Sequence, residues 1–301
     1  MTWLIAALGF GAGVLSGIAL AVVEFGAWAL VMPRRISETR SWTGGSDSIR
    51  VRAADGAELT GRWVPAPDPT GRTVVLIHGF IDGPAMMLID RAPAILDRGW
   101  NVAAIDLRGY GESQGPYSSF GAREAGDLKA WLDELAHLVP AGEPFVPVVW
   151  GRSMGASIAL RAAAEDDRIE ALVLEAPMVD LRHSVRTVMR NRKLPMAPAF
   201  SRLVVRRAAR IAGASLARPG SLELAPRFDR PVIVVHGSDD DLIPTALGRR
   251  LADAFPSPAP FLEISGARHA DVARVGGRQM LEQVMDFLDT TTLTAGRGTN
   301  A

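Results

Sequence analysis

The feature that most constrains this chain is a serine between two glycines at a predicted strand-to-helix junction. The motif Gly151-Arg152-Ser153-Met154-Gly155 follows the apolar run Phe145–Trp150, which predicts a buried strand, and precedes a run of helix formers at 156–164. A serine on such a turn takes a strained backbone conformation, and only small neighbours let the chain bend so sharply. The turn exposes the hydroxyl and directs backbone N–H groups at whatever it attacks. Glycine-serine turns without chemistry share the pattern, so the motif alone leaves both interpretations open.

Two more apolar, β-branched runs precede the serine. Thr73–Ile77 ends in His78-Gly79-Phe80, and Val102–Ile105 ends in a loop, D-L-R-G-Y-G-E-S, at 106–113. Residues 48–53 and 57–65 predict a β-hairpin around Asp55-Gly56. Helices are expected between or after the strands, at 86–98, 121–138, 153–165, 244–255 and 277–288. Alternating strands and helices predict a largely parallel, doubly wound sheet.

With these motifs in this order, the sequence resembles the α/β-hydrolase superfamily over roughly residues 48–289. The HG turn, the D-x-R-G-x-G-x-S loop and the nucleophile elbow carry the resemblance. It implies an α/β-hydrolase fold with a helical cap insertion and a serine hydrolase whose nucleophile is Ser153. It also implies that the backbone N–H groups of Phe80 and Met154 form an oxyanion hole for the charge that develops on the carbonyl oxygen.

The resemblance also assigns the base, because the family's chain order is serine, then acid, then histidine. His78 and His137 precede the serine, and His183 lies in the expected cap with no clear strand-end acid before it. His236 opens a segment, H-G-S-D-D-D-L-I-P, that matches the family's H-G-x-x-D-x-x-V/I-P pattern after a strand at 232–235. Only His269, after a predicted strand at 261–264, follows that segment, so His269 is the expected base.

The pattern's spacing places the acid at Asp240, whose carboxylate would fix the histidine tautomer and stabilise the imidazolium. Asp239 and Asp241 are adjacent alternatives, and the three aspartates could instead cap the helix that begins near Pro244. Glu175, at the end of a predicted strand at 171–174, is a further alternative, because some triads place the acid one strand earlier. His78, His236, Asp106 and Arg108 are expected to organise their loops rather than to carry chemistry.

Composition excludes some functions and fits the rest. The net charge of +0 argues against a general nucleic-acid binder. The cysteine count of 0 excludes a disulfide framework, a thiolate nucleophile and a cysteine-based zinc site. We expect neither a cofactor nor a metal.

The first residues predict a single membrane-spanning helix. The run from Thr2 to Val23 has no charged residue, and its 22 residues suffice to cross a bilayer core of about 30 Å at about 1.5 Å per residue. Trp3 and Trp28 would lie at opposite interfaces. A cleaved signal peptide is the alternative, but it requires a basic start and a shorter apolar core. The basic residues after the span (Arg34, Arg35 and Arg40) predict a catalytic domain on the cytoplasmic face.

The interval between the expected sixth and seventh core strands is strongly basic. Residues 181–220 contain no acid and ten basic side chains, Arg182, Arg186, Arg190, Arg192, Lys193, Arg202, Arg206, Arg207, Arg210 and Arg218. Apolar residues interleave with the arginines as in a basic amphipathic helix, which can lie on an anionic leaflet. A solvated cap in an arginine-rich protein is the alternative.

The sequence therefore predicts an anchor at 1–32, a juxtamembrane linker at 33–47, a hydrolase domain at 48–289 with a cap at about 178–222, and a disordered tail at 290–301. The expected activity is cleavage of an ester-like acyl bond in a lipid or other acylated substrate by Ser153, His269 and Asp240. A thioesterase, a peptidase or an acyltransferase would use the same residues. A non-catalytic member of the fold that binds a partner or ligand is the alternative outside enzymes.

Overall fold

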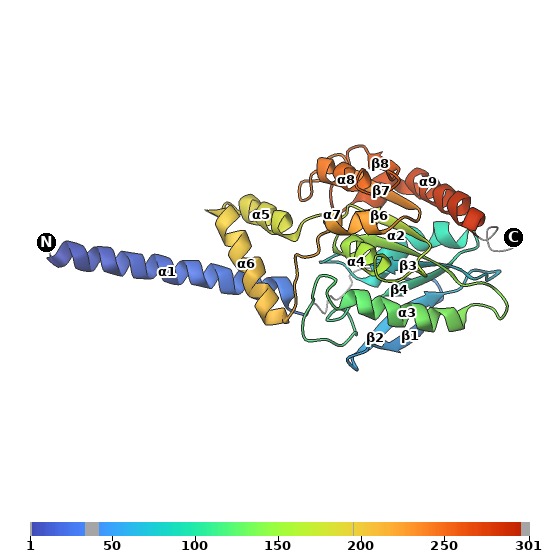
Figure 1. Cartoon of the computed structure of the whole chain (residues 1–301), viewed down its shortest axis with the longest axis horizontal. Helices are drawn as coiled ribbons and strands as arrows, with labels where there is room; N and C mark the ends of the chain where they lie inside the picture. The colour runs from blue at the N-terminus through green and yellow to red at the C-terminus, as the bar shows by residue number, and fades with distance from the viewer. Residues whose placement is uncertain (1, 34–41, 195, 296–301) are drawn as a thin grey trace.

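The computed structural model describes residues 2–33, 42–194 and 196–295 of the 301-residue chain. An α/β domain forms the body of the molecule, and a long N-terminal helix projects from it (Figure 1). This helix, α1 (Thr2–Val31), includes the segment Gly13–Val31, which is long and apolar enough to cross a membrane. The N-terminal residues of α1 lie far from the α/β domain (Figure 1).

An eight-stranded sheet in the order β1-β2-β4-β3-β5-β6-β7-β8 forms the centre of the domain. β1 pairs antiparallel with β2, and β2 pairs antiparallel with β4, while the remaining pairs are parallel. The central strands are buried on both faces, which explains their continuous apolar runs. The strands are β1 (Asp47–Arg52), β2 (Glu58–Val64), β3 (Arg72–Ile77), β4 (Asn101–Ile105), β5 (Val146–Arg152), β6 (Ala171–Glu175), β7 (Val232–Gly237) and β8 (Phe261–Ile264).

Helices cover both faces of the sheet, so the predicted doubly wound α/β-hydrolase fold is confirmed. Alternate residues of each strand contact opposite layers: Val75 and Ile77 of β3 pack with one group of helices, and Val74 and Leu76 pack with the other. The first group is α3 (Glu124–Leu138), α4 (Met154–Ala163) and α8 (Thr245–Ala252), and the second is α2 (Pro84–Leu96) and α9 (Val272–Ala295). The short α7 (Ser221–Leu224) and a 3-10 turn (Ala225–Arg227) precede β7.

Two helices between β6 and β7 occupy the interval in which a cap was expected. They are α5 (Leu181–Asn191) and α6 (Ala197–Ala212), which form a hairpin. α6 packs against α5 with one face and also against α1 (Figure 1). Gly26 allows the close approach of α1 and α6, because a Cβ there would lie 3.1 Å from a methyl group of Val204.

The basic residues of this interval are partly neutralised by acids outside it. Arg207 of α6 pairs with Glu24 of α1, with Nε and Oε1 2.5 Å apart. Arg218 pairs with Glu223, with Nη1 and Oε1 2.6 Å apart. A count of acids within residues 181–220 alone misses both partners, because each partner lies elsewhere in the chain.

The C-terminal helix is longer than expected. α9 continues to Ala295, whereas a disordered tail was predicted from residue 290. Thr290, Thr291 and Thr292 donate their hydroxyl hydrogens to carbonyl oxygens of the preceding turn, which satisfies these side chains within the helix. Residues 296–301 of the expected tail and 34–41 of the expected linker, including Arg34, Arg35 and Arg40, lie outside the described residues.

Candidate active site

The predicted nucleophile lies on a strained turn between β5 and α4. Ser153 has a φ of 53° and a ψ of −112°, in the positive-φ region that non-glycine residues rarely adopt. Its N–H donates to the carbonyl oxygen of Glu175, and its own carbonyl oxygen accepts from Met178, at 2.8 and 3.1 Å. A Cβ at Gly151 would overlap the carbonyl oxygen of Gly155, so this turn requires glycine there. The neighbouring strand and loop therefore hold the serine in its strained conformation.

The structure brings the three predicted triad residues together. Nε2 of His269 lies 2.9 Å from Oγ of Ser153, and Nδ1 of His269 lies 2.8 Å from Oδ2 of Asp240. His269 follows Ser153 by 116 residues and Asp240 by 29 residues in the sequence, and the fold brings it within hydrogen-bond distance of both. Because a carboxylate only accepts, Nδ1 carries the imidazole hydrogen and Nε2 faces the serine with its lone pair. This protonation state allows His269 to take the serine proton.

Asp240 is buried and saturated with donors. Its Oδ1 accepts the backbone N–H groups of Leu242 and Ile243, at 2.9 and 2.7 Å. Its Oδ2 lies 3.1 Å from Nε2 of His236 in addition to its contact with His269. Burial alone would raise the pKa of Asp240, but the hydrogen bonds from His236 and His269 outweigh it and hold that pKa well below its usual range. The carboxylate of Asp240 is therefore ionised at neutral pH.

The alternative acids have other surroundings. Asp239 and Asp241 are exposed, and Asp239 accepts a hydrogen bond from the hydroxyl of Ser238. Glu175 is buried in an ion pair with Arg91, at 2.6 Å between Nη2 and Oε1, and also accepts from the indole N–H of Trp150. Of these four acids in the described part of the chain, Asp240 is the one bonded to His269.

The two residues expected to form an oxyanion hole lie beside the nucleophile. Met154 is the first residue of α4, so its N–H has no partner four residues earlier within the helix. Phe80 follows Gly79, where a Cβ would lie 3.5 Å from Cβ of Ser153, so the turn after β3 packs against the elbow. The ring of Phe80 stacks on that of Phe120, with centroids 5.6 Å apart. The catalytic role of the two N–H groups remains a prediction.

The two loop histidines make the hydrogen bonds expected of structural residues. His78 is fully buried, with Nδ1 2.7 Å from the carbonyl oxygen of Gly79, and its Nε2 accepts from the N–H of Leu107. Nε2 of His236 lies 2.9 Å from the carbonyl oxygen of Ile243. Burial lowers the pKa of His78, so it stays neutral at pH 7.

Arg152 is a site residue that sequence reasoning missed. Its Nη1 pairs with the carboxylate of Asp82 in the turn after β3, and its Nη2 donates to the carbonyl oxygen of His269 at 3.1 Å. Its Nε lies 3.7 Å from Glu175. This buried guanidinium joins the loop of the expected oxyanion hole to the loop that carries the base. The sequence signal for this role was the arginine at the first variable position of G-x-S-x-G, because a charged side chain next to the nucleophile must have polar partners close by.

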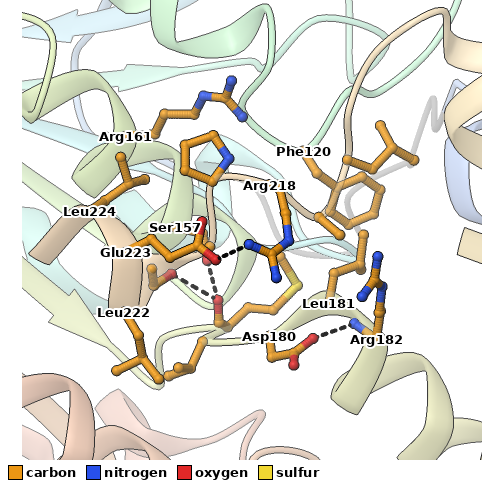
Figure 2. A pocket seen from close by; sticks show the side chains of 17 residues that line it. Phe120, Ser157, Arg161, Asp180, Leu181, Arg182, Arg218, Leu222, Glu223 and Leu224 are labelled. Carbon is orange, nitrogen blue, oxygen red and sulfur yellow. Dashed lines mark hydrogen bonds and ion pairs between the residues drawn. The ribbon is translucent and has the colours of Figure 1, made fainter. Parts of the chain in front are cut away.

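A cavity of about 150 Å³ is lined by Ser157, which Figure 2 labels and which lies one helical turn after the nucleophile. Ser157 and Met178 line it, and the N–H groups of both donate to the carbonyl oxygen of Ser153. Its apolar lining residues include Phe120 and Leu181, which Figure 2 labels. Three arginines also line it, Arg161, Arg182 and Arg218. Two acids, Asp180 and Glu223, line it as well, and Glu223 pairs with Arg218. The cavity therefore offers apolar surface and charged groups of both signs next to the elbow.

Within the described residues, no cluster of three histidine or acidic side chains has the arrangement of a metal site. The chemistry that the triad geometry supports uses protein groups. It comprises a hydroxyl nucleophile, an imidazole that accepts its proton and a buried carboxylate that orients the imidazole.

The comparisons with known proteins agree with the fold. A model of the family described as serine aminopeptidase, S33, matches residues 68–221, which include Phe80 and Ser153 but end before Asp240 and His269. An uncharacterized protein of Mycobacterium tuberculosis is 29% identical over 246 residues, which are 81% of this chain and 80% of that protein. A lysophosphatidylserine lipase of Danio rerio is 26% identical over 160 residues, which are 52% of this chain and 39% of the lipase. The solved structure of an esterase from Pyrococcus furiosus has a TM-score of 0.69 at 24% identity and covers 87% of this chain and 98% of its own.

Proposed function

The chain belongs to the serine aminopeptidase, S33, family of α/β-hydrolases, and from this premise we propose that it is a membrane-anchored serine hydrolase that cleaves an ester-like acyl bond. The observation that carries the proposal is the pair of hydrogen bonds, 2.9 and 2.8 Å long, that joins Ser153 to His269 and His269 to Asp240. Asp240 is the acid of the proposal because the other candidates are exposed or, like Glu175, paired with an arginine.

In the proposed reaction, Oγ of Ser153 attacks the substrate carbonyl carbon while Nε2 of His269 takes the hydroxyl proton. Asp240 stabilises the imidazolium that forms. The N–H groups of Phe80 and Met154 stabilise the negative oxygen of the tetrahedral intermediate, at about 3–4 kcal/mol for each donor. His269 then gives its proton to the leaving alcohol. Water, activated by His269, cleaves the acyl-enzyme and regenerates Ser153.

A lipid or another acylated amphiphile is the proposed substrate. α1 supplies a hydrophobic anchor, which would hold the domain close to substrates dissolved in a membrane. The cavity beside the elbow has apolar surface that suits an acyl chain, and its arginines, of which Arg218 is paired with Glu223, suit an acidic group. The similarity to a lysophosphatidylserine lipase supports this substrate class. We keep the cytoplasmic orientation as part of the proposal, on the strength of the arginines that follow α1.

Aminopeptidase activity is the second candidate, and the description of the matching family favours it. Removal of an N-terminal residue uses the same triad but also requires a carboxylate that binds the free ammonium group of the substrate. Asp82, the carboxylate beside Gly79, is already paired with Arg152. Of the two acids in the cavity, Glu223 is paired with Arg218 and Asp180 caps α5. These pairings favour an ester substrate over an N-terminal peptide.

Labelling with a fluorophosphonate probe tests the nucleophile. We expect covalent labelling of the full-length protein and complete loss of labelling in Ser153→Ala. Ser157→Ala is the matched control, because Ser157 lies one turn along the same helix and its hydroxyl bonds to the carbonyl oxygen of Met178. Absence of labelling in the folded wild-type protein would show that the chain is a non-catalytic member of the fold.

A substrate panel tests the bond that is cleaved. We expect turnover of nitrophenyl esters that rises with acyl length, and little turnover of aminoacyl anilides. Thioesters measure thioesterase activity, and an added alcohol acceptor measures acyl transfer. Faster turnover of aminoacyl anilides than of any ester would establish the peptidase in place of the esterase.

A further inference from the structure

Exposed apolar side chains gather on the α5–α6 hairpin. Four large ones, Val188, Leu194, Met196 and Leu203, are between 36% and 69% exposed. Outside α1, among residues whose side chains the structure describes, only Met32, Ile81 and Val275 are other large apolar residues that are comparably exposed, and Met32 directly follows α1. Two of the four, Leu194 and Met196, lie where the chain turns from α5 into α6. A gathering of this kind, unlike scattered surface leucines, indicates a surface that meets a nonaqueous partner.

Basic side chains surround this apolar end. Arg190, Arg192 and Lys193 are exposed at the end of α5, and Arg202 and Arg206 are exposed on α6. Exposed apolar tips next to arginines and lysines are typical of segments that enter the boundary between the headgroups and the acyl chains of an anionic leaflet. The partner that this combination fits best is therefore an anionic lipid surface.

The packing of α6 on α1 fixes where such a surface would lie. A groove between the two helices is lined by Leu20 and Val23 of α1 and by Phe200 and Leu203 of α6. Further along α1, Glu24 pairs with Arg207. The hairpin therefore lies beside the C-terminal part of α1, while the N-terminal part extends away from it (Figure 1).

The length of α1 then selects its register in a bilayer. A hydrocarbon core of about 30 Å takes about 20 helical residues, so a span that starts at Thr2 ends at about Ala21. Leu20, which lines the groove between α1 and α6, lies at that level. A span over Gly13–Val31 would instead draw α6, with Arg206 and Arg210, into the hydrocarbon, where arginine is strongly disfavoured.

We propose that the α5–α6 hairpin is a second membrane contact, whose apolar end enters the leaflet at the level of Leu20. This contact would fix residues 2–21 as the part of α1 that crosses the hydrocarbon core. The inference rests on the proposed anchoring by α1 and adds the depth at which the catalytic domain sits. Residues 22–31 of α1 and the Glu24–Arg207 pair then lie in the headgroup region beside α6. This register places Arg206 and Arg210 at the edge of the hydrocarbon, whereas a span over Gly13–Val31 would place them inside it.

Depth-dependent fluorescence quenching tests the register. The chain has no cysteine, so a single introduced cysteine carries an environment-sensitive fluorophore at one site. The full-length protein is reconstituted into anionic vesicles that contain lipids with a nitroxide in the headgroup, high on the acyl chain or near its end. We expect the deep nitroxide to quench Val14→Cys most strongly, and the headgroup nitroxide to quench Phe25→Cys most strongly.

The label at Met196→Cys reports on the hairpin. We expect blue-shifted emission and quenching by the shallow acyl-chain nitroxide, while Val275→Cys on α9, a matched exposed position, stays unquenched. Strong quenching of the Phe25 label by the deep nitroxide would overturn the register, and an unquenched Met196 label would overturn the hairpin contact. A Met196 label that is shielded only at high protein density would mean that a second copy of the chain covers the hairpin. If the Val14 label is also unquenched, α1 does not cross the bilayer and the anchoring itself is wrong.

Discussion

Replacing Asp240 with asparagine tests the proposed triad most directly, because the structure determines which way the amide must point. Oδ1 of Asp240 accepts two backbone N–H groups, from Leu242 and Ile243. The amide oxygen of Asn must occupy that position, since the amide nitrogen would face two donors there. The amide nitrogen then points at Nδ1 of His269, which lies 2.8 Å from Oδ2 in the native protein. His269 must accept at Nδ1 and carry its hydrogen on Nε2.

In that tautomer His269 cannot accept the proton of Ser153, although every atom stays near its native position. Loss of the correct tautomer in triads of this geometry costs about 10⁴-fold in kcat. At about 1.4 kcal/mol for each factor of ten, this is about 5.5 kcal/mol of transition-state stabilisation. KM should change little, because Asp240 is buried and the change removes an interaction made during proton transfer.

The assay is steady-state hydrolysis of a soluble nitrophenyl ester at neutral pH, with the folded state checked by circular dichroism. Asp239→Asn and Asp241→Asn are the matched controls, since both side chains are exposed, and each should retain near-wild-type kcat. If Asp240→Asn keeps kcat within tenfold of wild type, the reasoning fails. A large defect in Glu175→Gln that is specific to kcat would then transfer the acid to Glu175.

Three further predictions concern the surroundings of the triad. Arg152→Lys retains a charge near Asp82 but lacks the planar fork that also reaches the carbonyl oxygen of His269. In steady-state kinetics we expect kcat to fall about tenfold or more, with KM nearly constant and an altered pH–rate profile. An unchanged kcat and pH–rate profile would mean that Arg152 has no positioning role. Gly155→Ala places a Cβ 2.6 Å from the carbonyl oxygen of His78, so denaturant unfolding should show a loss of about 2–3 kcal/mol, and an unchanged midpoint would refute the clash. Burial lowers the pKa of His78 in the folded protein, so the unfolded chain binds more protons below about pH 6.5. The free energy of unfolding should therefore fall as the pH drops from about 6.5, by up to about 1.4 kcal/mol per pH unit. His78→Gln should weaken this pH dependence, and an equal pH dependence of the unfolding free energy in the two proteins would contradict the assignment.

Much of the fold could be predicted because its determinants are local. Central strands buried on both faces must be apolar along their length, and the runs that end at Ile77 and Ile105 show this directly. The elbow also has a local cause, since the turn at Ser153 admits only glycine at positions two residues away on each side. The base followed from chain order, because His269 is the histidine that remains after the acid.

The parts that sequence reasoning missed depend on side chains that meet across long separations. Arg152 reaches residues 70 positions before it and 117 positions after it, and no local pattern encodes either partner. The packing of α1 on α6 was missed because an apolar helix face is equally suited to lipid and to another helix. The helical continuation through Thr290 depends on hydroxyl groups that bond back to the preceding turn, and threonine is not by itself a helix signal.

The ion pair between Glu24 and Arg207 has a consequence for how the protein is made. The two residues are 183 positions apart, and ribosomes add about 5–20 residues per second, so α1 has been synthesised for roughly 10–40 s before its partner exists. During that interval only water or lipid headgroups can solvate the carboxylate of Glu24. The nascent chain therefore carries an unpaired charge in the C-terminal part of α1 until α6 has been translated and has folded against it. The ion pair between α1 and α6 can therefore form only after the nucleophile and most of the α5–α6 hairpin have been synthesised.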